Sequence, residues 1–207
     1  MLLYTYLFSG QYQKRILDTA RHCKTFQQQH KQEGKCTPEG DGVLIFDEVR
    51  VVARLMWNSR NQRVVGFSMC HDDLANLLDV YSLLDPDAAP KSTTYILQFL
   101  WRDLTSSFDV VGPYFTSSGP MESKAILGIV LETIKLFYLY DFNTSVLVCD
   151  GASPNLTTTK TTMGLSGVFA RQPLSVDPNA INPSFTNPFN PSLSIYWMIC
   201  PSHQVRI

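Results

Sequence analysis

The sequence has few cysteines and almost no net charge, and each absence excludes a class of protein. Its five cysteines are odd in number and form no CxxC pair, which argues against a disulfide framework or a zinc finger and predicts a reducing, intracellular compartment. With 17 basic and 18 acidic residues the net charge is -1, so no global cationic field attracts nucleic acid. Because 44% of residues are hydrophobic and 17% charged, the composition is that of a folded chain.

Long uninterrupted apolar runs are missing as well. Residues 1–9 are apolar but too short to span a bilayer, and they lack the positive start and the cleavage site of a secretory signal. The apolar run from Ala125 to Tyr140 is interrupted by Glu132 and Lys135, which indicates a buried helix. We therefore expect no membrane partner.

The N-terminal part of the sequence predicts a helix and a linker, which together form a segment at residues 1–42. Residues 10–33 lack proline and place three apolar residues at helical spacing: Ile16, Ala20 and Cys23. Residues 35–42 contain a proline and two glycines, as linkers do. Basic residues are dense here, which is typical of a solvated helix face, with a phosphate-contacting face as the alternative. They are Lys14, Arg15, Arg21, Lys24, Lys31 and Lys35.

Residues 43–207 predict an α/β domain. Alternating and continuous apolar runs indicate strands, and a Gly-Pro-Met-Glu start at residue 119 indicates a helix with proline at its first position. The order is three β segments, a helix and a further strand, so a βββαβ mixed sheet is expected. The predicted elements are strand 43–51, hairpins 54–69 and 93–116, helix 120–140, strand 144–149 and strand 193–200, the last preceded by a Pro/Asn-rich loop at 172–192.

Two acids in this pattern suggest a metal site. Asp47 lies inside the first β run, and Asp150 ends the buried strand before Gly151. If these strands pair, both carboxylates reach one edge of the sheet, where converging carboxylates need a cation such as Mg²⁺ or Mn²⁺. Burying Asp47 among apolar residues costs several kcal/mol unless it is paired or liganded. Glu48, by alternation, is expected to face solvent. The alternative for Asp150 is a simple turn start with Gly151.

The strings around both acids resemble motifs of the P-element-type transposase family, which includes host proteins with a THAP zinc finger. GVLIFDEVRV contains Asp47 and VLVCDGASPN contains Asp150, while ILQFLWRDL, FDVVGPYFTSSG and IYWMICPSHQVRI complete the family's order over residues 43–207. The resemblance implies an RNase H-like fold with Asp47 and Asp150 as catalytic ligands of Mg²⁺ or Mn²⁺. It also implies DNA as a partner, homo-oligomerisation and a nuclear location.

The sequence also departs from this family. The family's third acid, its GTP-binding insertion and its DNA-binding finger are absent from the sequence, so the catalytic domain is expected to be incomplete at its C-terminus and inactive alone. Cys200 stands where the family has Asp, and His203 matches a family His for which we expect a structural role. Two alternatives stay open: a domesticated, non-enzymatic remnant that serves as an interaction or DNA-tethering module, and an unrelated α/β domain.

Overall fold

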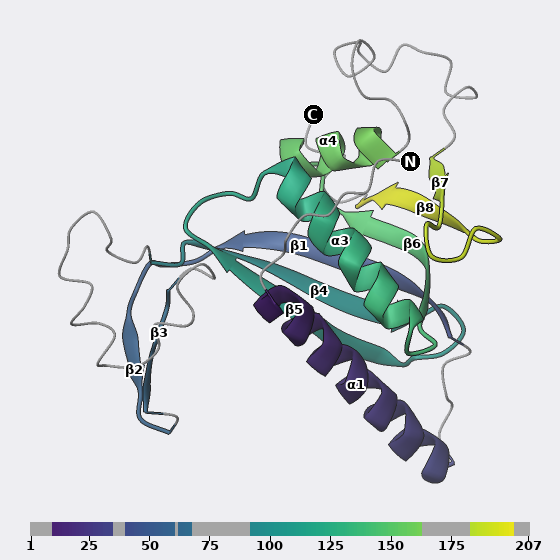
Figure 1. The fold of residues 1–207 in the computed structure, drawn as a ribbon, viewed down its shortest axis with the longest axis horizontal. Helices are drawn as coiled ribbons and strands as arrows, with labels where there is room; N and C mark the ends of the chain where they lie inside the picture. The colour runs from purple at the N-terminus through teal and green to yellow at the C-terminus, as the bar shows by residue number, and fades with distance from the viewer. Residues whose placement is uncertain (1–9, 35–39, 61, 68–91, 163–182, 201–207) are drawn as a thin grey trace. The chain divides into compact units, whose positions relative to one another are not determined.

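In the computed structural model, helices and strands alternate much as the sequence predicts (Figure 1). The structure describes residues 10–34, 40–60, 62–67, 92–162 and 183–200. The elements in these ranges are α1 (Gly10–Gln32), β1 (Asp41–Arg50), β2 (Met56–Asn58), β3 (Arg63–Val65), β4 (Tyr95–Asp103), β5 (Asp109–Ser117), α3 (Ser123–Tyr138), β6 (Asn143–Cys149), α4 (Ser153–Thr162), β7 (Ser184–Thr186) and β8 (Ser194–Ile199).

The main sheet has six strands in the order β5-β4-β1-β6-β8-β7 and is mixed, as expected. The strands β1, β6 and β8 run parallel, while β7 runs antiparallel to β8. Backbone hydrogen bonds from Val51 to Thr94 and from Leu104 to Asp41 join opposite ends of β1 and β4, as in an antiparallel pair. The parallel centre places the carboxyl ends of β1, β6 and β8 at one edge.

The chain divides into two compact units, which we describe separately. The first consists of residues 1–47, 99–113 and 122–207, and the second of residues 48–98 and 114–121. The first unit holds most of the apolar core, in which aromatic rings contact one another edge to face or tilted. Its largest fully buried side chains are Phe46, Phe99, Trp101, Phe137, Phe142, Leu44, Ile126, Ile129 and Ile134.

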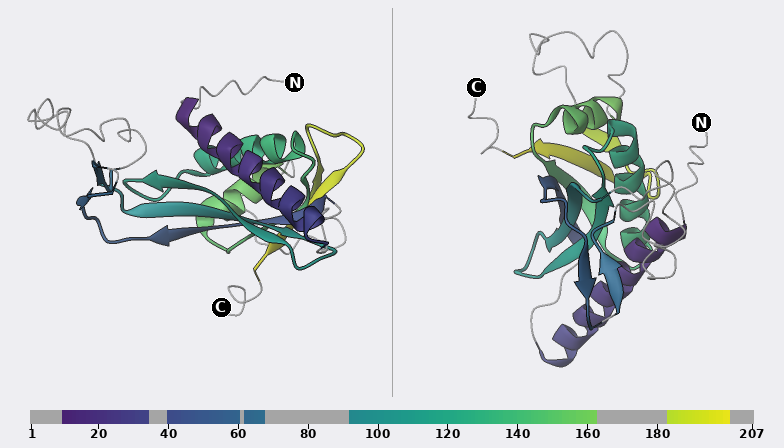
Figure 2. Two further views of the ribbon diagram at one scale, coloured as in Figure 1. Left: turned by 90° about the horizontal axis from the view of Figure 1, so that it is seen from below. Right: turned by 90° about the vertical axis from the view of Figure 1, so that its left-hand side faces the viewer.

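Helices α1 and α3 lie on one face of the sheet in the first unit (Figure 2). The predicted stripe of α1 is buried: Ile16, Ala20 and Cys23 are each 1% exposed or less. Burial raises the pKa of the Cys23 thiol to about 12, against a weaker opposing backbone hydrogen bond, so this thiol is neutral at physiological pH. The N-terminal helix therefore belongs to the core of this unit.

Helix α3 begins later than the sequence predicts. Its N-cap is Glu122, in an extended conformation, and the first helical residue is Ser123, so the expected start at residue 120 is wrong. The physical reason lies in the preceding backbone, because the Met121 N–H donates to Glu48 Oε1 at 2.9 Å and is satisfied outside a helix. The apolar face is as expected, with Ile126, Ile129, Val130, Ile134 and Phe137 all buried.

In the second unit, β2 and β3 form a two-stranded antiparallel sheet of their own, paired from Met56–Val65 to Asn58–Arg63. This confirms the predicted hairpin but separates it from the main sheet. At its base, the Thr93 N–H donates to Gly66 O and the Thr93 hydroxyl donates to Phe67 O. These bonds connect the hairpin to the start of β4.

The Pro/Asn-rich segment 172–192 is not wholly a loop. Ser184–Thr186 form β7, which pairs antiparallel with β8, and Asn187 is fully buried directly after it. The pairing was hidden in the sequence because prolines flank a segment of three residues, too short to show alternation. The rest of the predicted loop up to residue 182 and the excursion at 70–91 lie outside the described residues. No helix within the described ranges combines the length and apolarity needed to cross a membrane.

Candidate metal centre at the ends of β1 and β6

The register of β1 on β6 brings the two predicted acids level. The pairs run from Val43–Val146 through Leu44–Leu147 to Ile45–Val148. Counting two residues further along both strands sets Asp47 opposite Asp150. Level partners in a parallel pair share a face, and neighbouring strands lie about 4.8 Å apart. The backbone therefore puts both acids at the same edge and on the same side.

The burial of the two acids on β1 is the reverse of the expectation. Asp47 is exposed, while Glu48 is half-buried and its Oε1 accepts a hydrogen bond from the Met121 N–H. The prediction that Glu48 faces solvent is therefore wrong. The reason is the alternation of β1, in which Leu44 and Phe46 point to the buried face and Glu48 follows them, whereas Asp47 follows Ile45 to the open side.

The carboxylate of Asp150 is held at the start of α4. Its Oδ1 accepts hydrogen bonds from the Ala152 N–H at 3.0 Å and from Asn155 Nδ2 at 2.6 Å. Asn155 is 3% exposed, so its amide occupies a fixed place in the core. The N-terminus of a helix also favours a nearby anion. Both bonds end on the same oxygen, which orients the carboxylate and directs Oδ2 away from them.

The residue before Asp150, Cys149, carries a buried thiol. Burial raises the pKa of this thiol to about 12, and the charge of Asp150 raises it as well. A hydrogen bond with Thr159 lowers the pKa, and the charge of Asp47 raises it. In the absence of a metal ion, the Cys149 thiol is therefore neutral at physiological pH.

Cys200 directly follows β8, the strand next to β6 in the sheet. Its N–H donates to Cys149 O at 2.8 Å, and Cys149 is level with Ile199, so counting one residue further sets Cys200 opposite Asp150. Cys200 is half-buried. The edge thus carries Asp47, Asp150 and Cys200 on three successive strands, with a sulfur where the resembling family has a carboxylate. His203 lies outside the described residues.

The donor set suits a hard divalent cation but is incomplete. Two carboxylates at one edge offer the oxygen ligands that Mg²⁺ and Mn²⁺ prefer. In the described part of the chain, no group of three or more His, Cys, Asp or Glu side chains is arranged to hold a metal ion. Asp47 and Asp150 alone would leave most coordination positions to water or to other ligands.

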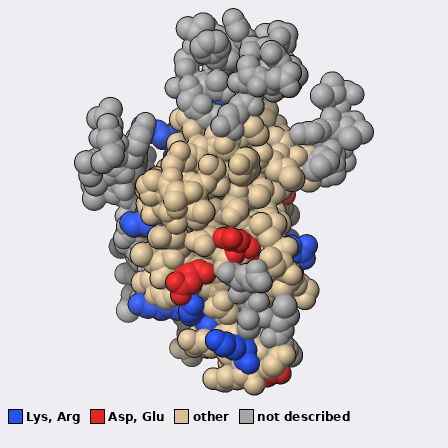
Figure 3. Space-filling view, turned by 90° about the vertical axis from the view of Figure 1, so that its right-hand side faces the viewer, with Lys and Arg blue, Asp and Glu red and all other residues tan. Residues whose placement is uncertain are grey.

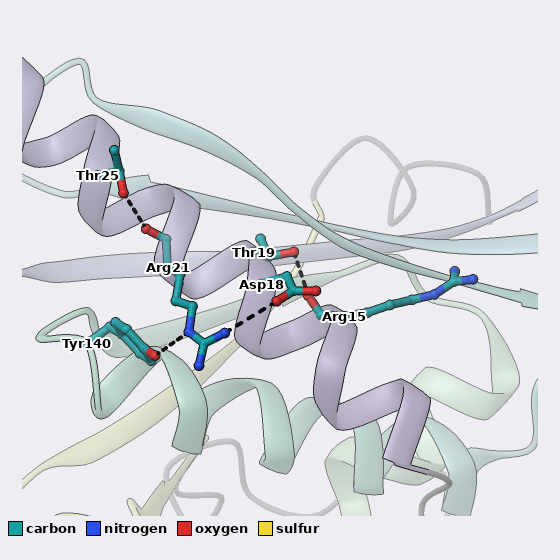
Figure 4. A network of polar contacts seen from close by, with 6 residues as sticks. All are labelled: Arg15, Asp18, Thr19, Arg21, Thr25 and Tyr140. Atoms are coloured by element: carbon teal, nitrogen blue, oxygen red, sulfur yellow. Dashed lines mark hydrogen bonds and ion pairs between the residues drawn. The ribbon is translucent and has the colours of Figure 1, made fainter. Parts of the chain in front are cut away.

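Two basic residues of α1, Arg21 and Lys24, have acidic partners in the described part of the chain. On the side of the molecule shown in Figure 3, basic and acidic side chains lie among a larger uncharged surface. Arg21 lies between Asp18, at 3.6 Å, and the hydroxyl of Tyr140, to which its Nε donates at 3.2 Å (Figure 4). Lys24 pairs with Asp141 at 2.8 Å. These partners tie α1 to the turn after α3.

A mixed sheet whose parallel centre carries acids at the carboxyl ends of β1 and β6 defines an α/β domain of the RNase H-like class. The chain belongs to the family described as TNP-like, RNase H N-terminal domain, whose model matches residues 22–163. No curated protein matches it in sequence.

The structure is similar to that of the Drosophila P element transposase in its strand transfer complex, with a TM-score of 0.52 and 15% sequence identity. The match covers 81% of this chain and 28% of that chain, so this chain spans little more than a quarter of the transposase. At this identity the likeness concerns the fold. It agrees with the fold class and the family that the sequence motifs suggest.

Asn155 is the site residue that analysis of the sequence missed. It belongs to the same VLVCDGASPN string as Asp150 but carries no charge, so nothing in its residue type suggested a role. A signal was nevertheless present, because an Asp followed five residues later by Asn at the start of a helix can form a capping pair. Its burial and its bond to Asp150 become visible only in the fold.

Proposed function

We propose that this chain contributes two acids, Asp47 and Asp150, to an RNase H-like site that processes DNA with Mg²⁺ or Mn²⁺. The observation that carries the proposal is the register of β1 on β6, whose continuation by two residues beyond Ile45–Val148 would set these acids level. Family membership supports the proposal. A DNA substrate agrees with the nuclear location that the sequence resemblance implies.

The residues around the acids have separate tasks. When bound, a divalent cation would activate a water or hydroxyl nucleophile and stabilise the leaving oxygen of a phosphodiester. Asn155 and the Ala152 N–H hold one oxygen of Asp150, so its carboxylate is oriented before any ligand arrives. Cys149, on the other face of the same strand, is buried in the core.

The pair of acids is expected to bind a cation weakly and not to cleave DNA by itself. Two carboxylates satisfy few of the six or more positions around such an ion, and RNase H-like chemistry needs it held in a fixed place. Completion of the site requires at least one further oxygen ligand from outside the described residues. We therefore expect no strand cleavage or joining by the isolated chain.

Calorimetric titration with Mn²⁺ tests the proposal. The wild-type chain should give a saturable heat that is lost in Asp47→Ala and in Asp150→Ala. Asp109→Asn is the matched control, because Asp109 is a carboxylate at the start of another strand, β5, and pairs with Arg102. Equal heats from the wild type and both alanine variants, all folded by circular dichroism, would refute the site.

A second candidate function is a non-enzymatic module that keeps the fold for interaction or DNA tethering. Cys200, where the resembling family has Asp, and the lack of a three-ligand group in the described ranges favour it. Under this hypothesis, supplying a downstream RNase H-like fragment with the missing acid restores no metal-dependent cleavage. Restored metal-dependent cleavage would instead support the enzymatic function.

A further inference from the structure

The hairpin of the second unit concentrates positive charge in a chain that is close to neutral overall. Residues 49–67 contain four arginines, at positions 50, 54, 60 and 63, and no acidic residue. The whole chain has a net charge of -1, so this segment of 19 residues departs sharply from its surroundings. Positive charge gathered on a two-stranded ribbon favours a negatively charged ligand.

Three of these arginines, unlike Arg21 and Lys24 of α1, have no carboxylate partner among the described residues. Arg50, Arg54 and Arg60 are exposed, and none of them pairs with a carboxylate within the described part of the chain. In contrast, Arg21 and Lys24 of α1 have acidic partners. Among the described residues, the guanidinium groups of Arg50, Arg54 and Arg60 are therefore exposed and without an acidic partner.

Large apolar side chains lie among the arginines. Trp57 is 49% exposed, and Met56 and Leu55 beside it are 59% and 52% exposed. An isolated two-stranded hairpin is only marginally stable in water. An exposed indole such as that of Trp57 can mark a surface that binds a partner. Arginine interleaved with an exposed aromatic ring suits nucleic acid, whose phosphates pair with guanidinium groups and whose bases stack on rings.

The hairpin is held at both ends in a defined shape. At the tip, Asn58 Oδ1 accepts a hydrogen bond from the Arg60 N–H at 3.1 Å. At the base, Gly66 has a φ of +110°, and a Cβ there would meet Arg54 O at 2.1 Å, so the two arms approach closely. The arginines are therefore presented on a preorganised ribbon, which lowers the ordering cost of binding.

We propose that the β2–β3 hairpin, together with the end of β1 that leads into it, is a DNA-binding arm. In this arm Arg50 of β1 and Arg54 and Arg60 on either side of β2 contact phosphates, and Trp57 packs against a base or sugar. A two-stranded ribbon fits the major groove of a duplex. The choice of DNA among anionic partners rests on the proposed function. The observations of charge, exposure and missing ion pairs do not depend on the acids at the ends of β1 and β6.

Fluorescence anisotropy with a labelled blunt DNA duplex tests the arm, in EDTA and over a series of salt concentrations. In the variant Arg50→Gln/Arg54→Gln/Arg60→Gln, affinity should fall roughly tenfold or more, and the slope of log K against log salt should decrease by about 0.9 for each lost phosphate contact. Trp57→Ala should weaken binding about fivefold or more without changing that slope. The matched control removes the same charge from α1, in Arg21→Gln/Lys24→Gln/Lys31→Gln, and should bind like the wild type.

Equal affinity of the wild type and the hairpin variant would overturn the proposal, as would an equal loss in the α1 control. A duplex affinity that is unchanged while sedimentation shows loss of self-association would assign the arm to a second copy of the chain and also refute it. Because EDTA removes divalent cations, this binding measurement does not depend on a metal ion held by Asp47 and Asp150. Failure of the metal site and failure of the arm are thus observed separately.

Discussion

Asn155 is the side chain on which the orientation of Asp150 depends. Its amide donates a 2.6 Å hydrogen bond to Asp150 Oδ1 from a position that is 3% exposed. Its own Oδ1 is buried without a hydrogen-bond partner, which is a costly arrangement for an amide in the core. A residue kept at such a cost beside an acid is expected to serve that acid, which makes Asn155 a positioning residue.

Replacing Asn155 by Ala should weaken Mn²⁺ binding by about tenfold or more, the usual effect of removing a partner of a ligating carboxylate. Asn187→Ala is the control, because Asn187 is also a fully buried amide but lies after β7, away from the acids. It should lower stability without changing the Mn²⁺ affinity. Calorimetric titration and thermal melting of both variants measure the two effects. A Mn²⁺ affinity that is equal in Asn155→Ala and the wild type would exclude the positioning role.

The acids could be predicted from the sequence, but their surroundings could not. Asp47 and Asp150 stand out because each is a charge at a run of strand-forming apolar residues. Which of Asp47 and Glu48 points to the buried side depends on the face of β1 that the helices cover, and a strand pattern alone does not show it. The pairing of Asn155 with Asp150 depends on where α4 begins, which is likewise a property of the fold.

Among the strands, β1 depends on close packing against β4. Gly42 lies where a Cβ would meet the Trp101 ring at 2.3 Å and Arg102 O at 2.7 Å. A ring fully buried in the core and a backbone oxygen have little freedom to move aside. Glycine is therefore required at this position by the approach of the neighbouring strand.

Gly42→Ala is expected to destabilise the protein by about 1–3 kcal/mol, because the extra methyl group overpacks the contact with Trp101. Urea unfolding followed by tryptophan fluorescence measures the change. The control is Gly119→Ala, since a Cβ at Gly119 meets nothing within 4 Å. An equally small effect of both substitutions would show that β1 can move away from β4.

Helix α4 shows what a local sequence pattern can and cannot predict about a helix. The Thr/Lys-rich stretch at 156–166 indicates a short helix, and the chain is indeed helical over Ser153–Thr162 although it has no apolar periodicity. Thr157, Thr159 and Thr161 each donate to the carbonyl four residues earlier, which satisfies their hydroxyls but does not by itself favour the helix. The helix is also attached from outside, as the Trp197 indole N–H donates to Thr162 Oγ1 at 2.7 Å. Such tertiary bonds are invisible in a local pattern.

At the scale of the molecule, the first unit includes helix α1, which lies before the predicted main domain at residues 43–207. Helix α1 packs its buried stripe in this unit, and the Phe26 ring lies 5.7 Å from Phe108 in the turn between β4 and β5. The order of elements was enough to predict a mixed α/β sheet, since long strands and an apolar helix leave strong patterns. The division into two units was not predictable, because β1, β4 and β5 each run through both of them.

Ile16→Ala is expected to lower the stability of the first unit by about 2–5 kcal/mol, because it leaves a cavity where α1 meets α3. Thermal unfolding should show one shifted transition for α1 and the sheet together. Lys31→Ala is the control, since Lys31 is an exposed residue of the same helix. A separate early transition for α1, with the main transition unmoved, would instead support an independent N-terminal segment at residues 1–42.

The pairing of β1 with β6 contains one irregularity, which affects which acid of β1 lies nearest in register to Asp150. Gly42 pairs with Thr144, but Val43 pairs with Val146, so Ser145 is an extra residue in β6 and the offset between the strands changes from 102 to 103. Continued along both strands, the earlier offset would set Glu48 level with Asp150, whereas the later offset would set Asp47 there. The irregularity at Ser145 thus determines which of two adjacent acids a continued pairing brings level with Asp150.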